Sequence, residues 1–163
     1  MSTAGREPVF NIGEKVVYPQ QGVGSIVSLE TRNTREYYRV KIESSEMDVL
    51  LPVQNAATAG LRHLTSQSDV KKALASLAVK KESSGSDWKA RLQANQELMR
   101  EGTLLSVAQV VNTLYHRSKV KELPVQERKL YDNALSLLVD ESSYVLGIGK
   151  EEMKKKIFMK LER

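Results

Sequence analysis

The chain has 163 residues, of which 40% are apolar and 28% are charged, and its formal net charge is +5. These proportions exclude a wholly disordered chain, while the absence of cysteine excludes disulfides and thiolate metal sites and suits a reducing compartment. Because the first ten residues hold no apolar signal segment and no window approaches the roughly 18 apolar residues that cross a bilayer, we expect a soluble, cytoplasmic protein with no membrane partner.

The first 66 residues are predicted to form short antiparallel strands. The runs "KVVYP" and "GSIVSLET" flank a turn marked by one proline and two glycines, and "REYYRVKI" alternates with the period of a strand. In the next run, "MDVLLP", the same alternation would point Met47 inward together with Val49 and Leu51. With "LRHL" as a candidate fifth strand, these runs predict a small barrel or a strongly bent sheet.

The second part of the chain changes to helical spacing. "SQSD" fits a capping pattern before a first helix, and the segment "KKESSGSD" ends that helix. Asp87 or Ser86 then caps a second helix, residues 104–115 form the clearest amphipathic stripe, and Pro124 precedes another helix. "GIGKEEMKKKIFMKLER" predicts the last one. We expect a compact all-helical domain of about five helices, with one core shared by both parts of the chain as the alternative.

The formal charge is distributed unevenly along the chain. Residues 1–66 hold seven Lys or Arg and seven Asp or Glu, so residues 67–163 hold the other 18 of 25 cations and 13 of 20 anions. The whole excess of +5 therefore lies in the second part. Such an excess fits an anionic partner such as nucleic acid, and a merely solvated basic surface fits it as well.

The sequence contains no motif that indicates catalysis or cofactor binding. "GVGS" falls in a turn, and "GIGK" lacks both the preceding strand and the glycine spacing that cradles phosphates. His63 and His116 lie far apart without the carboxylate pattern of a metal site. No nucleophile elbow or paired-carboxylate motif is present. We therefore expect no enzyme, no cofactor and no bound metal.

The one tryptophan, Trp88, stands at the expected first turn of the second helix. Asp87 precedes it, and the cations Lys89 and Arg91 follow. An indole in this position can project outward as an apolar wedge between cations that hold phosphates. The alternative is that it packs onto a neighbouring helix, as tryptophans usually do.

Five stretches resemble one known family. "FNIGEKVVYPQQGVGSIVSLETR" is similar to the opening signature of the CarD/CdnL family of bacterial transcription regulators. "LPVQNAATAGLR", "DWKARLQANQELMREG", "VAQVVNTLY" and "LPVQERKLYDNALSLLVDE" resemble later blocks of that family in the same order. The resemblance runs from about Phe10 to the last predicted helix. The opening block alone also resembles the polymerase-binding module of transcription-repair coupling factors, which attach it to a helicase.

The resemblance implies an α+β fold of two domains. A Tudor-like small β barrel, residues 1–66, would dock on the RNA polymerase β subunit, and an all-helical domain, residues 67–163, would contact promoter DNA. Trp88 would wedge into the minor groove at the upstream edge of the transcription bubble and so stabilise the open complex. Arg32 matches a family position that contacts polymerase, whereas Leu50 stands where some members carry a second arginine.

The resemblance also suggests which residues face DNA. Arg91 and Arg128 match basic family positions, and Lys89 adds a cation beside Trp88. Ala90 and Gln93 replace cations that some members carry there, which predicts weaker phosphate anchoring. The alternative function is a stand-alone DNA- or RNA-binding module without a polymerase partner. We expect a monomer in either case.

Overall fold

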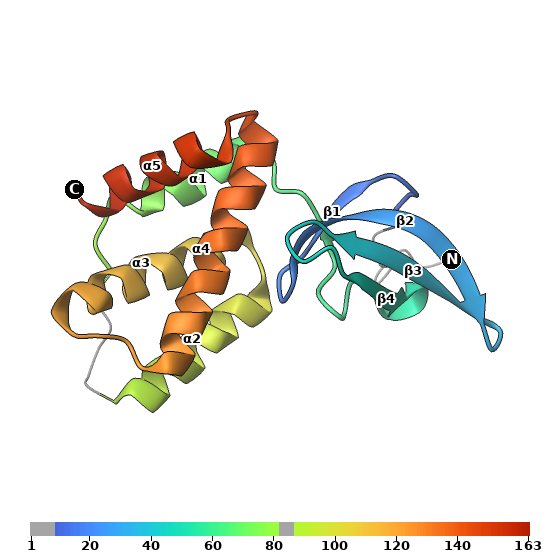
Figure 1. Ribbon diagram of the computed structural model, residues 1–163, viewed down its shortest axis with the longest axis horizontal. Coiled ribbons are helices and arrows are strands. Elements are labelled where there is room, and N and C mark those ends of the chain that lie inside the picture. The colour runs from blue at the N-terminus through green and yellow to red at the C-terminus, as the bar shows by residue number, and fades with distance from the viewer. Residues whose placement is uncertain (1–8, 82–86) are drawn as a thin grey trace, which may run out of the picture. The chain divides into compact units, whose positions relative to one another are not determined.

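The structure is a computed structural model that describes residues 9–81 and 87–163 (Figure 1). Within these residues, a five-stranded antiparallel sheet is followed along the chain by five helices. The chain divides into two compact units, a sheet unit that ends at Leu64 and a helical unit that begins at Thr65. The expected α+β fold is confirmed. Residues 82–86, which include Ser86 and most of the predicted linker, lie outside the described residues.

Five short strands form the sheet, in the spatial order β4-β3-β2-β1-β5. Their bounds are β1 (Lys15–Tyr18), β2 (Gly22–Arg32), β3 (Arg35–Ile42), β4 (Asp48–Pro52) and β5 (Arg62–His63), and a 3₁₀ turn, η1 (Val53–Asn55), follows β4. The β2–β3 turn consists of Asn33 and Thr34, whose φ values of 49° and 66° fit the hairpin turns that match strand twist. "LRHL" does supply a fifth strand, in which His63 pairs with Val16.

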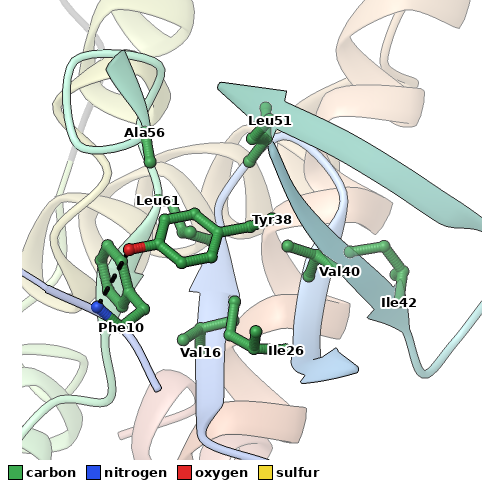
Figure 2. Packing of buried hydrophobic residues seen from close by; sticks show 9 residues of the cluster. All are labelled: Phe10, Val16, Ile26, Tyr38, Val40, Ile42, Leu51, Ala56 and Leu61. Carbon is green, nitrogen blue, oxygen red and sulfur yellow. Dashed lines mark hydrogen bonds between the residues drawn. The ribbon is translucent and has the colours of Figure 1, made fainter. Parts of the chain in front are cut away.

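The inner face of the sheet carries a core of nine buried side chains around Tyr38 (Figure 2). The Tyr38 hydroxyl accepts a hydrogen bond from the Phe10 amide at 3.3 Å, and the two rings meet edge to face. The alternation expected in "REYYRVKI" is confirmed, because Tyr38, Val40 and Ile42 are all buried. Met47 was expected inward but is 55% exposed. It precedes β4, directly after the turn residue Glu46 with its φ of 56°, so the strand alternation does not extend to it.

Gly24 lets β2 and β3 approach each other closely. A Cβ at this position would lie 2.6 Å from the carbonyl oxygen of Lys41 and 3.1 Å from Val40. Real Cβ atoms do not come this near to backbone, so the pairing of Gly24 with Ile42 requires a residue without a side chain.

The helices are α1 (Gln67–Ser76), α2 (Trp88–Glu101), α3 (Leu104–Val120), α4 (Val125–Leu146) and α5 (Lys150–Leu161). Most helix ends lie at the residue types that the sequence suggested, but α1 ends at Ser76, before the segment "KKESSGSD" that was expected to end it. Ser66 and Asp87 cap α1 and α2 by accepting hydrogen bonds from backbone amides at 3.2 Å and 3.0 Å. α2 ends at Gly102, whose φ of 74° is left-handed. None of the described helices is long and apolar enough to cross a membrane.

α3 is the centre of the helical unit and contacts α1, α2 and α4 (Figure 1). All six residues of its predicted stripe are buried: Leu104, Val107, Ala108, Val111, Leu114 and Tyr115. Asn112 on the same helix is also buried, and its side chain bonds the backbone that follows α1. Its amide donates to the carbonyls of Ser76 and Val79, and its oxygen accepts from the amide of Lys81. These bonds fix the end of α1 and the residues that directly follow it.

Candidate functional site

Trp88 is the first residue of α2 and is partly exposed. The Asp87 carboxylate accepts a hydrogen bond from the Lys89 amide, which fixes the start of the helix and the direction of the neighbouring side chains. The Lys89 ammonium lies 5.9 Å from the centre of the indole ring, within the range of a cation–π interaction. The expected position of the indole at a capped first turn is confirmed. The structure therefore presents an aromatic face and a cation together at one helix end.

A buried ion pair joins the first turn of α2 to the first turn of α4. Arg91 donates two parallel hydrogen bonds to Glu127, from Nε to Oε2 at 2.7 Å and from Nη2 to Oε1 at 2.6 Å. The two side chains are only 3% and 0% exposed. The bonds to Glu127 raise the pKa of Arg91 above its ordinary value, so the guanidinium stays charged. Figure 1 shows the starts of these two helices next to each other.

The ion pair with Glu127 leaves Arg91 unable to bind a DNA phosphate while the pair is intact. We expected Arg91 to hold a DNA phosphate, but the structure places its guanidinium in the interior and gives its bidentate face to Glu127. A phosphate contact would require this buried pair to break and would leave Glu127 as an unpaired buried charge. We therefore do not include Arg91 in the candidate DNA surface.

Sequence reasoning missed the partner, Glu127, although the spacing contained a signal. Arg91 lies four and eight residues before Asn95 and Met99, both of which are buried on the inner side of α2. Glu127 lies four residues before the buried Tyr131 on α4. Opposite charges that each occupy a core position of a different helix indicate a buried pair, because an unpaired charge would be too costly there.

Arg128 follows Glu127 directly but points to the surface, with a side chain that is 60% exposed. Its guanidinium lies 5.6 Å from the centre of the Tyr131 ring and its Nε lies 3.6 Å from the Asp132 carboxylate. Both contacts are weak at an exposed site, so the cation can still meet an anion. Ala90 and Gln93 are exposed as well, so cations at those positions would have been available to a partner.

The start of α4 adds to the positive potential of this surface. The first amides of a helix carry a partial positive charge and attract phosphate. The start of α4 has no side-chain cap and its one acidic first-turn residue, Glu127, is turned inward, whereas the Asp87 carboxylate already caps the start of α2. We call the group formed by the partly buried Trp88 and the exposed Lys89 and Arg128 the first-turn surface.

The second candidate region lies on the outer face of the sheet unit. Arg32 ends β2 with a side chain that is 56% exposed, and its Nη2 donates to Glu30 at 3.2 Å. Glu30 also accepts from Arg39 on β3, and Arg39 Nη1 donates in turn to Asp48 at 3.1 Å on β4. The bond from Arg39 is the main reason that the pKa of Glu30 lies below its ordinary value. A chain of alternating charges thus crosses three strands.

Leu50 joins the same outer face. The β3–β4 register sets Leu50 directly opposite Arg39, and the Leu50 side chain is half-buried. Arg39 was not among the expected polymerase-binding residues, although the alternation of "REYYRVKI" placed it on the face away from the core. We call Arg32, Arg39 and Leu50, with Glu30 between the two arginines, the outer-sheet surface.

No cluster of three or more His, Asp or Glu that could hold a metal ion occurs within residues 9–81 and 87–163. His63 contacts the Glu14 carboxylate through Nδ1, and its ring lies 4.6 Å from that of Phe10. Both contacts join the last strand of the sheet unit to the start of that unit.

Comparison with known proteins gives matches over both units. Residues 10–65 match the family described as "CarD-like/TRCF RID domain", and residues 72–158, more than half of the chain, match "CarD, C-terminal domain". YdeB of Bacillus subtilis (strain 168), named as a candidate transcription factor, is 27% identical to the chain over 150 residues. That alignment covers 90% of this chain and 98% of YdeB.

Proposed function

Because this chain belongs to the CarD family of bacterial transcription regulators, we propose that it binds RNA polymerase through its sheet unit and promoter DNA through its helical unit, and thereby stabilises the open complex. The predicted family is confirmed. The sheet unit is the Tudor-like domain of this family. Polymerase binding, the subunit that is bound, the DNA contact and the stabilisation of the open complex are the parts that the proposal adds.

For polymerase, we assign the outer-sheet surface to the β subunit. Arg39 already bonds two carboxylates, whereas Arg32 bonds only one oxygen of a shared carboxylate and keeps donors for a partner. Leu50 adds an apolar contact beside Arg39, which it faces in the β3–β4 register. An exposed arginine and a half-buried leucine on the same face of the sheet support recognition of a surface that offers a carboxylate and an apolar patch.

For DNA, the observation that carries the proposal is the partly exposed indole at the first turn of α2. Lys89 beside it opposes the helix dipole, which is locally unfavourable, so its position is better explained by an anionic partner. Unstacking a base step costs a few kcal/mol, and that cost is lowest where the duplex is already opening. A wedge that binds only the opened edge shifts the equilibrium toward the open complex, by no more than its preference for that state.

Arg32→Glu tests the polymerase half. We expect the full-length variant to bind the isolated β subunit about tenfold more weakly, because charge reversal turns an attraction at the interface into a repulsion. Titration calorimetry or surface binding measures the affinity. Lys72→Glu is the matched control, since Lys72 is an exposed cation on α1 in the other unit. Equal binding by the parent and Arg32→Glu would refute the assigned surface.

The alternative, a nucleic-acid-binding module without a polymerase partner, predicts tight binding to free DNA. The proposal expects weak, salt-sensitive binding to free duplex, because a formal excess of +5 neutralises few phosphates. Nanomolar affinity for naked DNA at physiological salt, together with no affinity for polymerase, would favour the alternative.

A further inference from the structure

The Arg91–Glu127 pair lies directly behind the first-turn surface. Trp88 precedes Arg91 by three residues, which is less than one turn and a rise of about 4.5 Å along α2. Glu127 is the residue before Arg128 on α4. The two groups that the proposed function needs, the partly exposed indole and the exposed Arg128 guanidinium, therefore each lie within one helical turn of a member of the pair.

Side-chain caps at these first turns are few. Pro124, the N-cap of α4, offers no side-chain cap, and α2 has the single cap from Asp87. The bidentate bonds fix both the distance and the angle between two planar groups, because a guanidinium and a carboxylate meet in only a few geometries. The pair thus determines how the start of α2 is oriented against the start of α4.

The energetics indicate that stability is not the main contribution of the pair. A buried ion pair is often no more stabilising than apolar side chains of the same size, since desolvation offsets the attraction. Here the desolvation is incompletely compensated, because Arg91 Nη1 is buried and has no acceptor among the described residues. An apolar pair would remove this unsatisfied donor. An apolar pair would not, however, fix the orientation of the start of α2 relative to the start of α4.

We propose that Arg91 and Glu127 are positioning residues, which act on DNA through Trp88 and Arg128 by holding them at a fixed separation and angle. This inference rests on the proposed function of the first-turn surface. It assigns Arg91 a role different from the phosphate contact that its sequence position suggested, and it gives Glu127 a role for the first time.

The principal test is the double replacement Arg91→Met with Glu127→Leu, which exchanges the pair for apolar side chains. We expect the protein to stay folded and to bind polymerase as the parent does. The emission of Trp88, the only tryptophan, should show lower anisotropy and stronger quenching by acrylamide in the free protein. The lifetime of open complexes formed with the variant should be severalfold shorter.

The same helix supplies a matched control. Arg100 and Glu97 form an exposed ion pair near the other end of α2, with side chains that are 66% and 58% exposed. Arg100→Met with Glu97→Leu makes the same chemical changes about 18 Å from Trp88 along the helix. It should leave the Trp88 emission and the open-complex lifetime unchanged.

Arg91→Lys provides a second test that does not depend on the double variant folding. Lysine keeps the charge but has no planar fork, so it cannot fix the angle of Glu127. We expect it to raise the mobility of Trp88 and shorten the open-complex lifetime, while Arg100→Lys does neither. Parent-like emission in folded Arg91→Lys, or altered emission with an unchanged lifetime, would overturn the proposal.

These readouts also separate this inference from the proposed function. Fluorescence of the free protein needs neither polymerase nor DNA. If the parent protein itself did not lengthen the lifetime of open complexes, the proposed function would be refuted. The emission changes could still show that the Arg91–Glu127 pair orients Trp88.

Discussion

Trp88→Ala distinguishes a wedge from a core residue. Because Trp88 is only partly buried and is not one of the buried core residues, we expect its removal to cost less free energy of unfolding than the loss of a core tryptophan and to leave polymerase binding intact, while open complexes decay severalfold faster. Thermal denaturation and promoter-complex lifetimes measure the two effects. A core tryptophan would instead lower stability by about 3–5 kcal/mol on truncation.

Leu114→Ala is the comparison for that experiment. Leu114 is fully buried on α3, so its truncation should cost about 2–5 kcal/mol and lower the melting temperature without any direct effect on DNA. The wedge would be refuted if Trp88→Ala destabilised the protein as much as Leu114→Ala, or if it stayed folded and still stabilised open complexes like the parent.

Glu30 should make the outer-sheet surface sensitive to acid. Its bond from Arg39 holds the pKa of the folded carboxyl below the ordinary value of 4.5. The resulting stabilisation is fully present above about pH 4.5 and disappears as the pH falls through the lower folded pKa. Denaturant titrations across this acidic range should show that Glu30→Gln depends less on pH than the parent does. Identical pH dependence would contradict a stabilising role for the carboxylate.

At the level of the elements, the close approach of β2 and β3 predicts a strong effect of one methyl group. Gly24→Ala would place a Cβ against the Lys41 carbonyl, and we expect a loss of about 1–3 kcal/mol as the strands move apart. Ser25→Ala on the same strand is the control and should change stability by less than about 0.5 kcal/mol. Unaltered stability of Gly24→Ala, measured by denaturation, would contradict the tight pairing.

The elements were also what the sequence predicted best. Alternation in "REYYRVKI" and the stripe of α3 follow from burial of one face, so the pattern alone locates the core. Ser66, Asp87 and Gly102 mark helix ends because each satisfies or ends the backbone hydrogen bonding locally. The prediction for Met47 was wrong because the turn residue Glu46, whose positive φ the alternation does not reveal, directly precedes Met47, and β4 begins only at Asp48.

The candidate site was predictable only in part, for a physical reason. Trp88 could be placed because its neighbours in the sequence determine the helix start. The position of Arg91 depends on Glu127, 36 residues later, and the link between Arg32 and Arg39 depends on the register of two strands. A sequence pattern shows which residues share a face of one helix or strand. It does not show which residue of another element will contact them.

For the whole molecule, the two compact units predict two unfolding transitions. Each unit has its own buried core, so calorimetry should show Gly24→Ala lowering one transition and Leu114→Ala the other. If either variant lowered a single common transition, both parts of the chain would share one core. The assignment of residues 1–66 to polymerase and 67–163 to DNA depends on this independence.

The ends of the sheet have a consequence for the protein at high concentration. Among the described residues, the sheet terminates at β4 and β5, which have five and two residues. β4 starts with a charge, Asp48, and ends with Pro52, which cannot donate a backbone hydrogen bond. Edge strands that are long, flat and apolar recruit other chains and start aggregation. β4 and β5 are too short, and β4 is too interrupted, for a strand of another copy to pair with them. We therefore expect the sheet to resist edge-to-edge association between copies.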